Sequence, residues 1–328
     1  MANVISVSIH SSQFPEKVRQ DLLDSFRTRK INHKFHYDSI KQTLKWLALH
    51  EAYSPSRRDA RCLAIYEQGF RRAAAKISSL RVHLFGLGCG GGQKDARLLA
   101  ILKKRGRTLR YTPADVSVAM TLVASETASR VIPARDCFPF VCDLTTAKDV
   151  AKNLFKTSDA KFARLFTFFG MIPNFEPQHI LRQLTGLLRP KDWLLFSANL
   201  APGENYDRGV EKILPLYDNE LTRDWLRTFL DDFGVLKNAG KINFTVENIS
   251  VAKRKLKRVA AHFHFTKSTG IYFPEARFNF RVGEKLRLFF SYRYTPKLLR
   301  EMLGDYQIEI CDEWVMAEEG VFLCRKRR

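Results

Sequence analysis

The chain has 328 residues, 45% of them hydrophobic and 12% aromatic, a composition typical of one large or two moderate globular domains and not of a disordered chain. Its 55 lysine and arginine residues against 34 acidic residues give a net charge of +21, a field that attracts anionic small molecules or nucleic acid. No apolar run approaches the ~20 residues of a membrane span, and the sequence has neither a signal-peptide pattern nor a CxxC pair. We therefore expect a cytoplasmic protein without membrane association, disulfides or a zinc site.

The first sixty residues are predicted to be helical. Residues 15–30 and 38–53 place apolar side chains three and four positions apart, and Asp38 is a candidate N-cap for the second of these helices. Another helix is expected after the sequence SPSRRD.

From residue 80 onward, short apolar runs alternate with helical patterns. Strand-like runs occupy residues 82–88, 108–117, 138–144, 163–170 and 192–200, and a helical pattern follows each of the first four. Such alternation over short connections predicts right-handed βαβ units and a parallel, doubly wound α/β sheet.

The alternation stops after Pro202. A helix at 221–234 precedes several strand-like segments, and the period-2 patterns HFHF and RFNFRV predict an antiparallel sheet with one solvated face. A helix at 295–303 and two final strands, predicted to form a hairpin on the main sheet, complete the chain. The expected division is a Rossmann-like domain of residues 60–200 plus 286–328, and a second α+β domain of residues 1–59 plus 201–285.

A glycine-rich loop, GLGCGGGQK, follows the first predicted strand and opens a helix. In a doubly wound sheet this is where a nucleotide-like ligand binds, because glycines such as Gly88 and Gly90 let the backbone approach the ligand closely. The loop alone also fits a dinucleotide or a turn without a ligand. A P-loop is excluded, because Lys94 is not followed by Ser or Thr in the required frame.

Polar residues at the next strand ends narrow the choice of ligand. Asp115 ends the second strand, where its carboxylate could accept hydrogen bonds from a ribose diol. Asp143 ends the third, where it could hold an adenine amino group while Leu144 packs on the ring. Each aspartate could instead be a helix cap, but their joint placement favours an adenosyl ligand. Asn174, after the fourth strand, could accept a hydrogen bond from an amine or serve as a turn residue.

Short motifs in a fixed order carry a family resemblance. They are HYD at 36–38, AYSPSR at 52–57, GLGCGGGQK at 86–94, YTPADVS at 111–117, FFGMIPNF at 168–175, YDN at 217–219 and SYRYT at 291–295. Together they resemble the histidine-specific N-methyltransferases of ergothioneine biosynthesis and their relatives, which include a dimethylallyltryptophan N-methyltransferase. The resemblance covers nearly the whole chain from Lys34. It implies a Rossmann-like class I methyltransferase sheet, a second domain that closes over an amino-acid substrate, and S-adenosylmethionine as methyl donor, released as S-adenosylhomocysteine.

The resemblance also implies roles for individual residues. The donor would be bound at its methionine end by Gly88, Gly90 and Lys94, at its ribose by Asp115, and at its adenine by Asp143 and Leu144. The substrate's amino and carboxylate groups would be handled by Tyr37, Gly170, Asn174 and Tyr217, and Ser291 would lie near its side chain. Asn174 and Tyr37 would be the catalytic pair, orienting the amine toward the donor methyl group.

Three positions depart from the family pattern. Ser54 stands where the histidine enzymes carry a substrate-facing tyrosine. Phe289 stands where they carry a glutamate that grips the imidazole, so histidine is not the expected substrate. Gly86 replaces the acidic residue that ends the first strand before the glycine loop, which weakens one donor contact.

The sequence thus predicts an S-adenosylmethionine-dependent N-methyltransferase that acts on an amino acid or related small amine. Two alternatives stay open: a methyltransferase acting on a protein or peptide amine, and a non-catalytic methyltransferase-like protein that binds an anionic partner. A nucleic-acid partner is not favoured, because basic residues cluster only at 253–258 and 325–328. No metal site is expected, since His262 and His264 share a strand face without a third ligand. The sequence makes no prediction of the oligomeric state.

Overall fold

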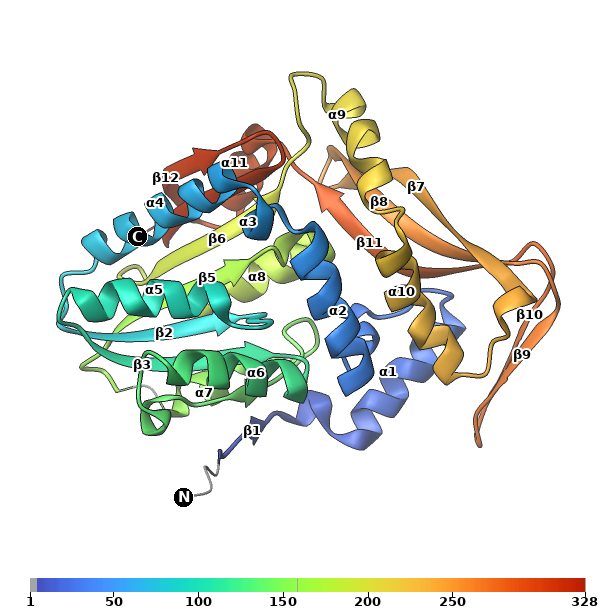
Figure 1. Cartoon of the computed structure of the whole chain (residues 1–328), viewed down its shortest axis with the longest axis horizontal. Coiled ribbons are helices and arrows are strands. Elements are labelled where there is room, and N and C mark those ends of the chain that lie inside the picture. The colour runs from blue at the N-terminus through green and yellow to red at the C-terminus, as the bar shows by residue number, and fades with distance from the viewer. Residues whose placement is uncertain (1–4, 158, 328) are drawn as a thin grey trace.

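The computed structural model describes residues 5–157 and 159–327, which form a large sheet at one end of the molecule and smaller antiparallel sheets at the other (Figure 1). The strands are β1 Ser8–Ile9, β2 Arg81–Leu87, β3 Thr108–Asp115, β4 Phe140–Val141, β5 Ala163–Phe169, β6 Trp193–Asn199, β7 Gly240–Val251, β8 Arg254–Phe265, β9 Thr269–Tyr272, β10 Arg277–Phe280, β11 Lys285–Arg293, β12 Ile308–Val315 and β13 Glu319–Lys326. The α-helices are α1 Pro15–Arg27, α2 Ile40–Tyr53, α3 Pro55–Arg58, α4 Ala60–Lys76, α5 Gln93–Lys104, α6 Val118–Ser129, α7 Val150–Leu154, α8 Pro177–Leu187, α9 Tyr206–Ile213, α10 Glu220–Asp232 and α11 Pro296–Asp305.

The large sheet has eight strands in the order β1-β4-β3-β2-β5-β6-β13-β12. All neighbours from β1 to β6 are parallel, while β13 pairs antiparallel with β6 and with β12. The predicted doubly wound α/β sheet and the predicted C-terminal hairpin on it are therefore confirmed. The order reverses beside β2, which places the glycine loop at the point where such sheets bind ligands.

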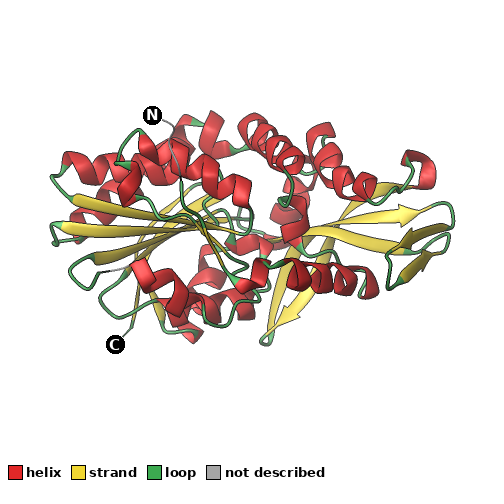
Figure 2. Cartoon of the chain, turned by 90° about the horizontal axis from the view of Figure 1, so that it is seen from below, coloured by secondary structure: helices red, strands yellow, loops and turns green. Residues whose placement is uncertain are grey.

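Helices cover both faces of the large sheet (Figure 2). On β2 and β5 the consecutive residues Leu84 and Phe85, and Leu165 and Phe166, point to opposite faces, as strand geometry requires. Leu84 and Leu165 belong to the core under α4, α5 and α6, and Phe85 and Phe166 to the core under α7, α8 and α11. Each such side chain, once fully buried, stabilises the fold by about 1.5–3 kcal/mol, so the apolar runs read from the sequence are strands packed on both sides.

The other strands are antiparallel, as the period-2 patterns predict, but they form two sheets and not one. RFNF lies in β10, which pairs with β9, while HFHF lies in β8 of the three-stranded sheet, which has the order β11-β8-β7. Helix α10 packs on it and also contacts α2, so the N-terminal helices lie between the two sheets (Figure 1). The expected division into two domains stays a prediction. Two strand pairings are relevant to where its boundaries lie. Strand β11, residues 285–293, pairs with β8, and the short strand β1 pairs with β4 of the large sheet.

Strand β11 contributes side chains to two hydrophobic cores. Phe289 packs in the core between the small sheet and α10, while Phe290 and Tyr292 belong to the core on the α8 face of the large sheet. Just beyond the strand, the Tyr294 amide donates a hydrogen bond to the Asn199 carbonyl of β6 at 3.3 Å. One continuous strand therefore connects the two sheets.

Two local expectations differ from the structure. Helix α2 is capped by Ser39 and not by Asp38. The Ser39 hydroxyl accepts a hydrogen bond from the Gln42 amide at 3.1 Å, and the side-chain oxygen of Gln42 accepts one from the Ser39 amide. This capping box satisfies two backbone amides at the start of the helix, whereas Asp38 lies one residue outside the N-cap position. The third predicted strand is shorter than expected, because only Phe140 and Val141 pair with their neighbours. Among the described residues, no helix has the length and apolar character needed to cross a bilayer.

Candidate active site

A cavity of about 720 Å³ opens where the carboxyl ends of the large sheet's strands meet β11, α2 and α10. This volume lies in the usual range for small-molecule sites. Every site residue predicted from the sequence lines it, from both ends of the molecule. They are Tyr37, Ser54, Gly88, Gly90, Lys94, Asp115, Asp143, Leu144, Gly170, Asn174, Tyr217, Phe289 and Ser291.

The glycine loop has a backbone that only glycine adopts without strain. Gly88 and Gly90 have φ of 58° and 50°, and a Cβ at Gly90 would lie 3.3 Å from the Trp46 ring. The Gly90 amide donates to Oδ2 of Asp115 at 3.1 Å, and the Ser117 amide donates to Oδ1 at 3.1 Å. Burial raises the pKa of Asp115, while these backbone amides act against that rise. The carboxylate is thus held in one orientation at the cavity wall.

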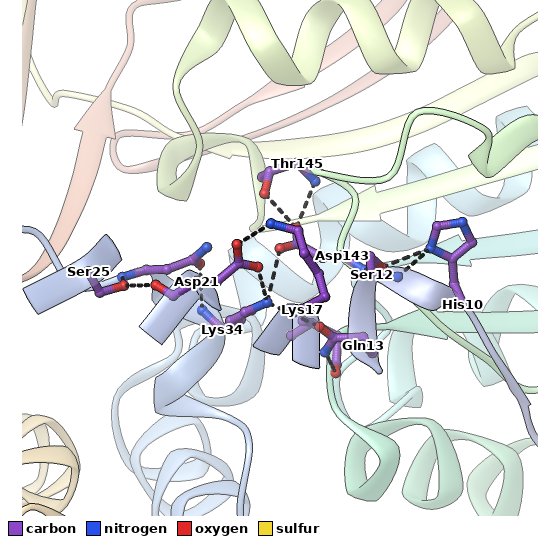
Figure 3. Close-up of polar contacts among 11 residues, drawn as sticks. His10, Ser12, Gln13, Lys17, Asp21, Ser25, Lys34, Asp143 and Thr145 are labelled. Carbon is purple, nitrogen blue, oxygen red and sulfur yellow. Dashed lines mark hydrogen bonds and ion pairs between the residues drawn. The ribbon is translucent and has the colours of Figure 1, made fainter. Parts of the chain in front are cut away.

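Asp143 has one oxygen satisfied and one free. Its Oδ1 accepts the Thr145 amide at 2.8 Å and the Thr145 hydroxyl at 2.5 Å. Its Oδ2 is buried without a hydrogen-bond partner among the described residues, and the nearest cation, the Lys34 ammonium, lies 3.7 Å away. Lys34 instead donates to Asp21 of α1 at 2.6 Å (Figure 3). A buried free acceptor calls for a donor from a ligand, such as an amino group.

Asp95 is a site residue that the sequence reading missed. Its carboxylate accepts hydrogen bonds from Tyr111 and Thr167 at 2.7 Å each, and it lines the cavity at the first turn of α5. A Cβ at Gly86 would lie 2.1 Å from Oδ2 of Asp95. Helix α5 therefore places the Asp95 carboxylate beside Gly86, the position at which the family pattern has an acidic residue. A side chain at position 86 and the Asp95 carboxylate could not both occupy this space. A sequence signal could have identified Asp95: the first strand ends without the expected acidic residue, and an acidic residue follows in the first turn of the next helix.

Lys94 directly precedes Asp95 in the first turn of α5 and belongs to a buried network of polar side chains. Its ammonium donates to the Tyr66 hydroxyl at 2.9 Å; Tyr66 donates its one hydrogen to Glu319 and shares a hydrogen bond of 2.7 Å with the Ser197 hydroxyl, which is then the donor. Burial lowers the pKa of Lys94. Ser197 also accepts the Gly170 amide at 2.9 Å, so the network links α5 to the end of β5.

Asn174 ends a single 3₁₀ turn, Ile172–Asn174, after β5. Its backbone amide donates to the Met171 carbonyl at 2.9 Å, while its side-chain amide makes no hydrogen bond to another described residue and faces the cavity. Across the cavity, Tyr37 packs against Trp46 and Trp225 with ring centroids 5.9 and 5.5 Å away. Burial and the nearby Asp115 carboxylate raise the pKa of Tyr37, so its hydroxyl stays a neutral donor.

The other end of the cavity is aromatic. Phe289 stacks on His33 at 4.9 Å and meets Trp225 edge to face at 5.7 Å. Ser291 follows two residues later on β11, and the Ser54 hydroxyl bonds Ser56 at 2.8 Å on the facing wall. No carboxylate occupies the Phe289 position, so the wall there offers an apolar ring and no acceptor.

Groups of three or more His, Cys, Asp or Glu side chains able to hold a metal ion are not found in residues 5–157 and 159–327. His262 and His264 lie on one face of β8, with ring centroids 6.4 Å apart, and His262 lies 3.4 Å from Glu247.

Several solved methyltransferase structures resemble the chain at low sequence identity. The CcbJ methyltransferase from Streptomyces caelestis has 12% identity and a TM-score of 0.42, with 80% of this chain and 90% of that chain covered. Mitomycin 7-O-methyltransferase MmcR has 14% identity and a TM-score of 0.43, with 96% and 69% covered. The DhpI–SAH complex has 11% identity and a TM-score of 0.44, with 94% and 98% covered. No significant match was found among curated proteins.

A family model assigns the chain without relying on these structures. The model described as histidine-specific methyltransferase, SAM-dependent, matches residues 15–326. Among the described strands, this span includes all but β1, and it includes every residue of the predicted site. With its mostly parallel α/β sheet and glycine loop after β2, the chain belongs to this family of S-adenosylmethionine-dependent methyltransferases.

Proposed function

We propose that the protein transfers a methyl group from S-adenosylmethionine to the nitrogen of an amino acid or related small amine other than histidine. The observation that carries this proposal is the placement of Asn174. Its free side-chain amide faces the same cavity as the glycine loop and the two strand-end aspartates, and Tyr37 faces it from α2's side of the cavity.

The residues at the sheet end of the cavity fit the methyl donor. Gly88 and Gly90 have left-handed φ values that favour glycine, and a Cβ at Gly88 would lie 2.7 Å from Met171. Asp115 presents an oriented carboxylate for the ribose, and the free Oδ2 of Asp143 suits the adenine amino group. Leu144, buried beside Asp143, would pack on the ring. When bound, S-adenosylmethionine supplies an electrophilic methyl group on a sulfonium.

The protein's part in the reaction is to present an unprotonated amine in line with that methyl group. The Asn174 carbonyl can accept a hydrogen bond from an amine N–H and so aim the nitrogen lone pair. Tyr37 remains a neutral phenol and adds no negative charge that would stabilise an ammonium. Partial removal of the amine from water in the cavity would disfavour its charged form, which eases loss of its proton.

Phe289 supports an acceptor other than histidine. A histidine substrate would bring imidazole N–H donors, and the wall formed by Phe289, His33 and Trp225 presents ring faces and edges there. Leaving such a donor unpaired in a buried site is costly.

A panel of amines incubated with S-adenosylmethionine tests the function. We expect methylated product, detected by mass, from at least one amino acid with an apolar or aromatic side chain, and none from histidine. Calorimetry with S-adenosylmethionine alone is the companion measurement. Donor binding without methylation of any amine would contradict the proposal, and no donor binding would point to a non-catalytic relative.

Donor affinity should depend on pH through Asp95. Burial raises the pKa of Asp95 to about 6, so its carboxylate gains charge as the pH rises through that value. Because the donor's methionine end carries positive charge, we expect its affinity to rise roughly tenfold between about pH 5 and pH 7. Asp95→Asn should remove this rise in calorimetric titrations. An equal change at the half-buried Asp136, which does not line the cavity, should leave it intact, and an unchanged pH profile in the Asp95 variant would refute the role.

The same shift has a consequence for stability. The pKa of Asp95 is higher in the folded protein than in the unfolded chain, so the folded state binds more protons between the two values. The free energy of unfolding should therefore fall as the pH rises from about 4 through about 6, and Asp95→Asn should lose this dependence.

A further inference from the structure

The segment before helix α1 runs along the edge of the large sheet and ends beside the loop that carries Asp143. Its strand β1 pairs in parallel with β4, and the His10 amide donates to the Val141 carbonyl at 2.9 Å. A single 3₁₀ turn, Ser11–Gln13, follows. Because paired parallel strands run in the same direction, this turn lies next to the residues that follow β4.

Ser12 gives the backbone of Asp143 a partner that the sheet does not provide. After β4, the Cys142 amide still donates to the Asp115 carbonyl of β3, at 2.9 Å. The next amide, that of Asp143, donates instead to the Ser12 hydroxyl at 3.0 Å (Figure 3). Both residues are buried. The loop with the candidate adenine-binding carboxylate is thus held by a side chain 131 residues away in the sequence.

His10 fixes the orientation of the Ser12 hydroxyl. The Ser12 amide lies 3.0 Å from Nδ1 of His10 and can only donate, so Nδ1 is an acceptor. The ring hydrogen is therefore on Nε2, which donates to Oδ1 of Asp149 at 2.8 Å. The Ser12 hydroxyl, 2.9 Å from Nδ1, then donates its own hydrogen to the ring and keeps its lone pairs for the Asp143 amide.

Gln13 holds the other side of the turn. Its side-chain amide donates to the Val116 carbonyl at 2.6 Å, and its side-chain oxygen accepts from the Lys34 ammonium at 3.3 Å. Val116 directly follows Asp115, so the turn is joined to the loop after β3 as well as to the loop after β4. The position of Ser12 is therefore fixed by β1 before it and by Gln13 after it.

The contacts from Asp149 through His10 to Ser12 have the order of a nucleophilic triad, but their surroundings do not suit that role. None of the three residues lines the cavity, and the Ser12 oxygen already accepts from the Asp143 amide. A nucleophile needs an oxygen that can reach its substrate. The arrangement instead orients one hydrogen-bond acceptor inside the protein.

We propose that Ser12 and His10 are positioning residues of the methyl-donor site, which orient the Asp143 carboxylate and so set a preference for adenine over a 6-oxopurine base. The free Oδ2 of Asp143 can accept a hydrogen bond from the 6-amino group of adenine, whereas the 6-oxo group of hypoxanthine brings a second acceptor to that position. A fixed carboxylate discriminates best, because hydrogen bonds weaken steeply with angle. The contact between Asp143 and adenine rests on the donor site described under the proposed function.

Two pairs of nucleosides test the proposal by calorimetry. The unmodified protein should bind 5′-methylthioadenosine more tightly than 5′-methylthioinosine by a factor on the order of 100, and Asp143→Ala should remove most of this base preference. Ser12→Ala should reduce it by roughly five- to tenfold. The preference for 5′-methylthioadenosine over its 2′,3′-dideoxy analogue depends on the ribose contact and should be unchanged in Ser12→Ala.

Variants at His10 separate positioning from general stability. His10→Asn keeps an acceptor in place of Nδ1 and should retain the base preference within about twofold, whereas His10→Ala should behave like Ser12→Ala. Both lose the bond to Asp149, so both should lower the Tm. Ser125 of α6 is a matched control: it is 5% exposed, as is Ser12, and its hydroxyl donates to the Thr121 carbonyl at 2.6 Å. Ser125→Ala should leave both preferences unchanged.

Three results would overturn the proposal. In the first, Ser12→Ala lowers the Tm and weakens both purine nucleosides equally, as a purely structural role requires. In the second, His10→Asn loses the base preference as fully as His10→Ala. In the third, the unmodified protein shows no preference for the adenine nucleoside, or Asp143→Ala keeps it. Methylation of an amine would still support the proposed function in each case, whereas a base preference without methylation would defeat that function alone.

Discussion

Replacing Asn174 with alanine is expected to lower turnover by a factor on the order of 10²–10³ while donor affinity stays within about twofold. The side chain has no structural hydrogen bond to lose, and its turn is held by the backbone bond to Met171. Without the Asn174 carbonyl, the amine can still bind, but its nitrogen lone pair is no longer directed at the donor methyl group. Such misorientation strongly lowers the rate of a displacement reaction. Single-turnover rates with saturating donor measure the loss, and calorimetry measures the donor.

Two further variants make this result specific. Asn174→Asp keeps an acceptor oxygen but adds a charge that stabilises the ammonium, so activity should return only as the pH is raised. The exposed Asn243, on β7, gives a control alanine variant that should behave like the unmodified protein. Turnover within threefold of normal in Asn174→Ala would exclude the role.

Replacing Asp115 with alanine should weaken the binding of S-adenosylmethionine by roughly 100-fold. The carboxylate is oriented by the amides of Gly90 and Ser117, so both oxygens remain able to accept from a ribose diol. Loss of two hydrogen bonds to a charged acceptor accounts for the expected size. Calorimetry at constant pH measures it, with Tm as a check on folding.

A ligand change identifies the contact. The unmodified protein should bind 5′-methylthioadenosine more tightly than its 2′,3′-dideoxy analogue, and Asp115→Ala should bind the two alike. Because removal of Asp115 also frees two loop amides, a general loss of affinity is not sufficient. If the variant still discriminates between the two nucleosides, the ribose contact lies elsewhere.

The donor end of the cavity could be located from sequence because its residues directly follow strands. The carboxyl ends of parallel strands meet at one edge of the sheet, so the sequence alone predicts that Asp115 and Asp143 lie close together. Their hydrogen bonds are not predictable in this way. Lys34, which is far from Asp143 in the sequence, lies 3.7 Å from its Oδ2 but donates its hydrogen bond to Asp21.

The acceptor end depends on long-range packing that no local pattern encodes. The family resemblance pointed to Phe289 and Ser291, but the walls around them come from α2 and α10, through Trp46 and Trp225. The sequence pattern could have identified Arg293 as a third residue of this wall, because it continues the period-2 series of Phe289 and Ser291. Its hydrogen bond to the Tyr217 hydroxyl joins two segments far apart in the sequence and is a property of the folded chain alone.

Strand β11 has a consequence for how tightly a ligand can be held. Its first half, with Leu286 and Phe289, lies in one core, and its second half, with Phe290 and Tyr292, lies in the other, so packing holds the strand along its length. A binding wall built on such a strand pays little conformational entropy when a ligand arrives, since the strand is already ordered. Weak ligands at the acceptor end of the cavity should then dissociate fast, without rearrangement of the sheets. Their affinity should depend on the side chains of the wall and not on the free energy needed to order it.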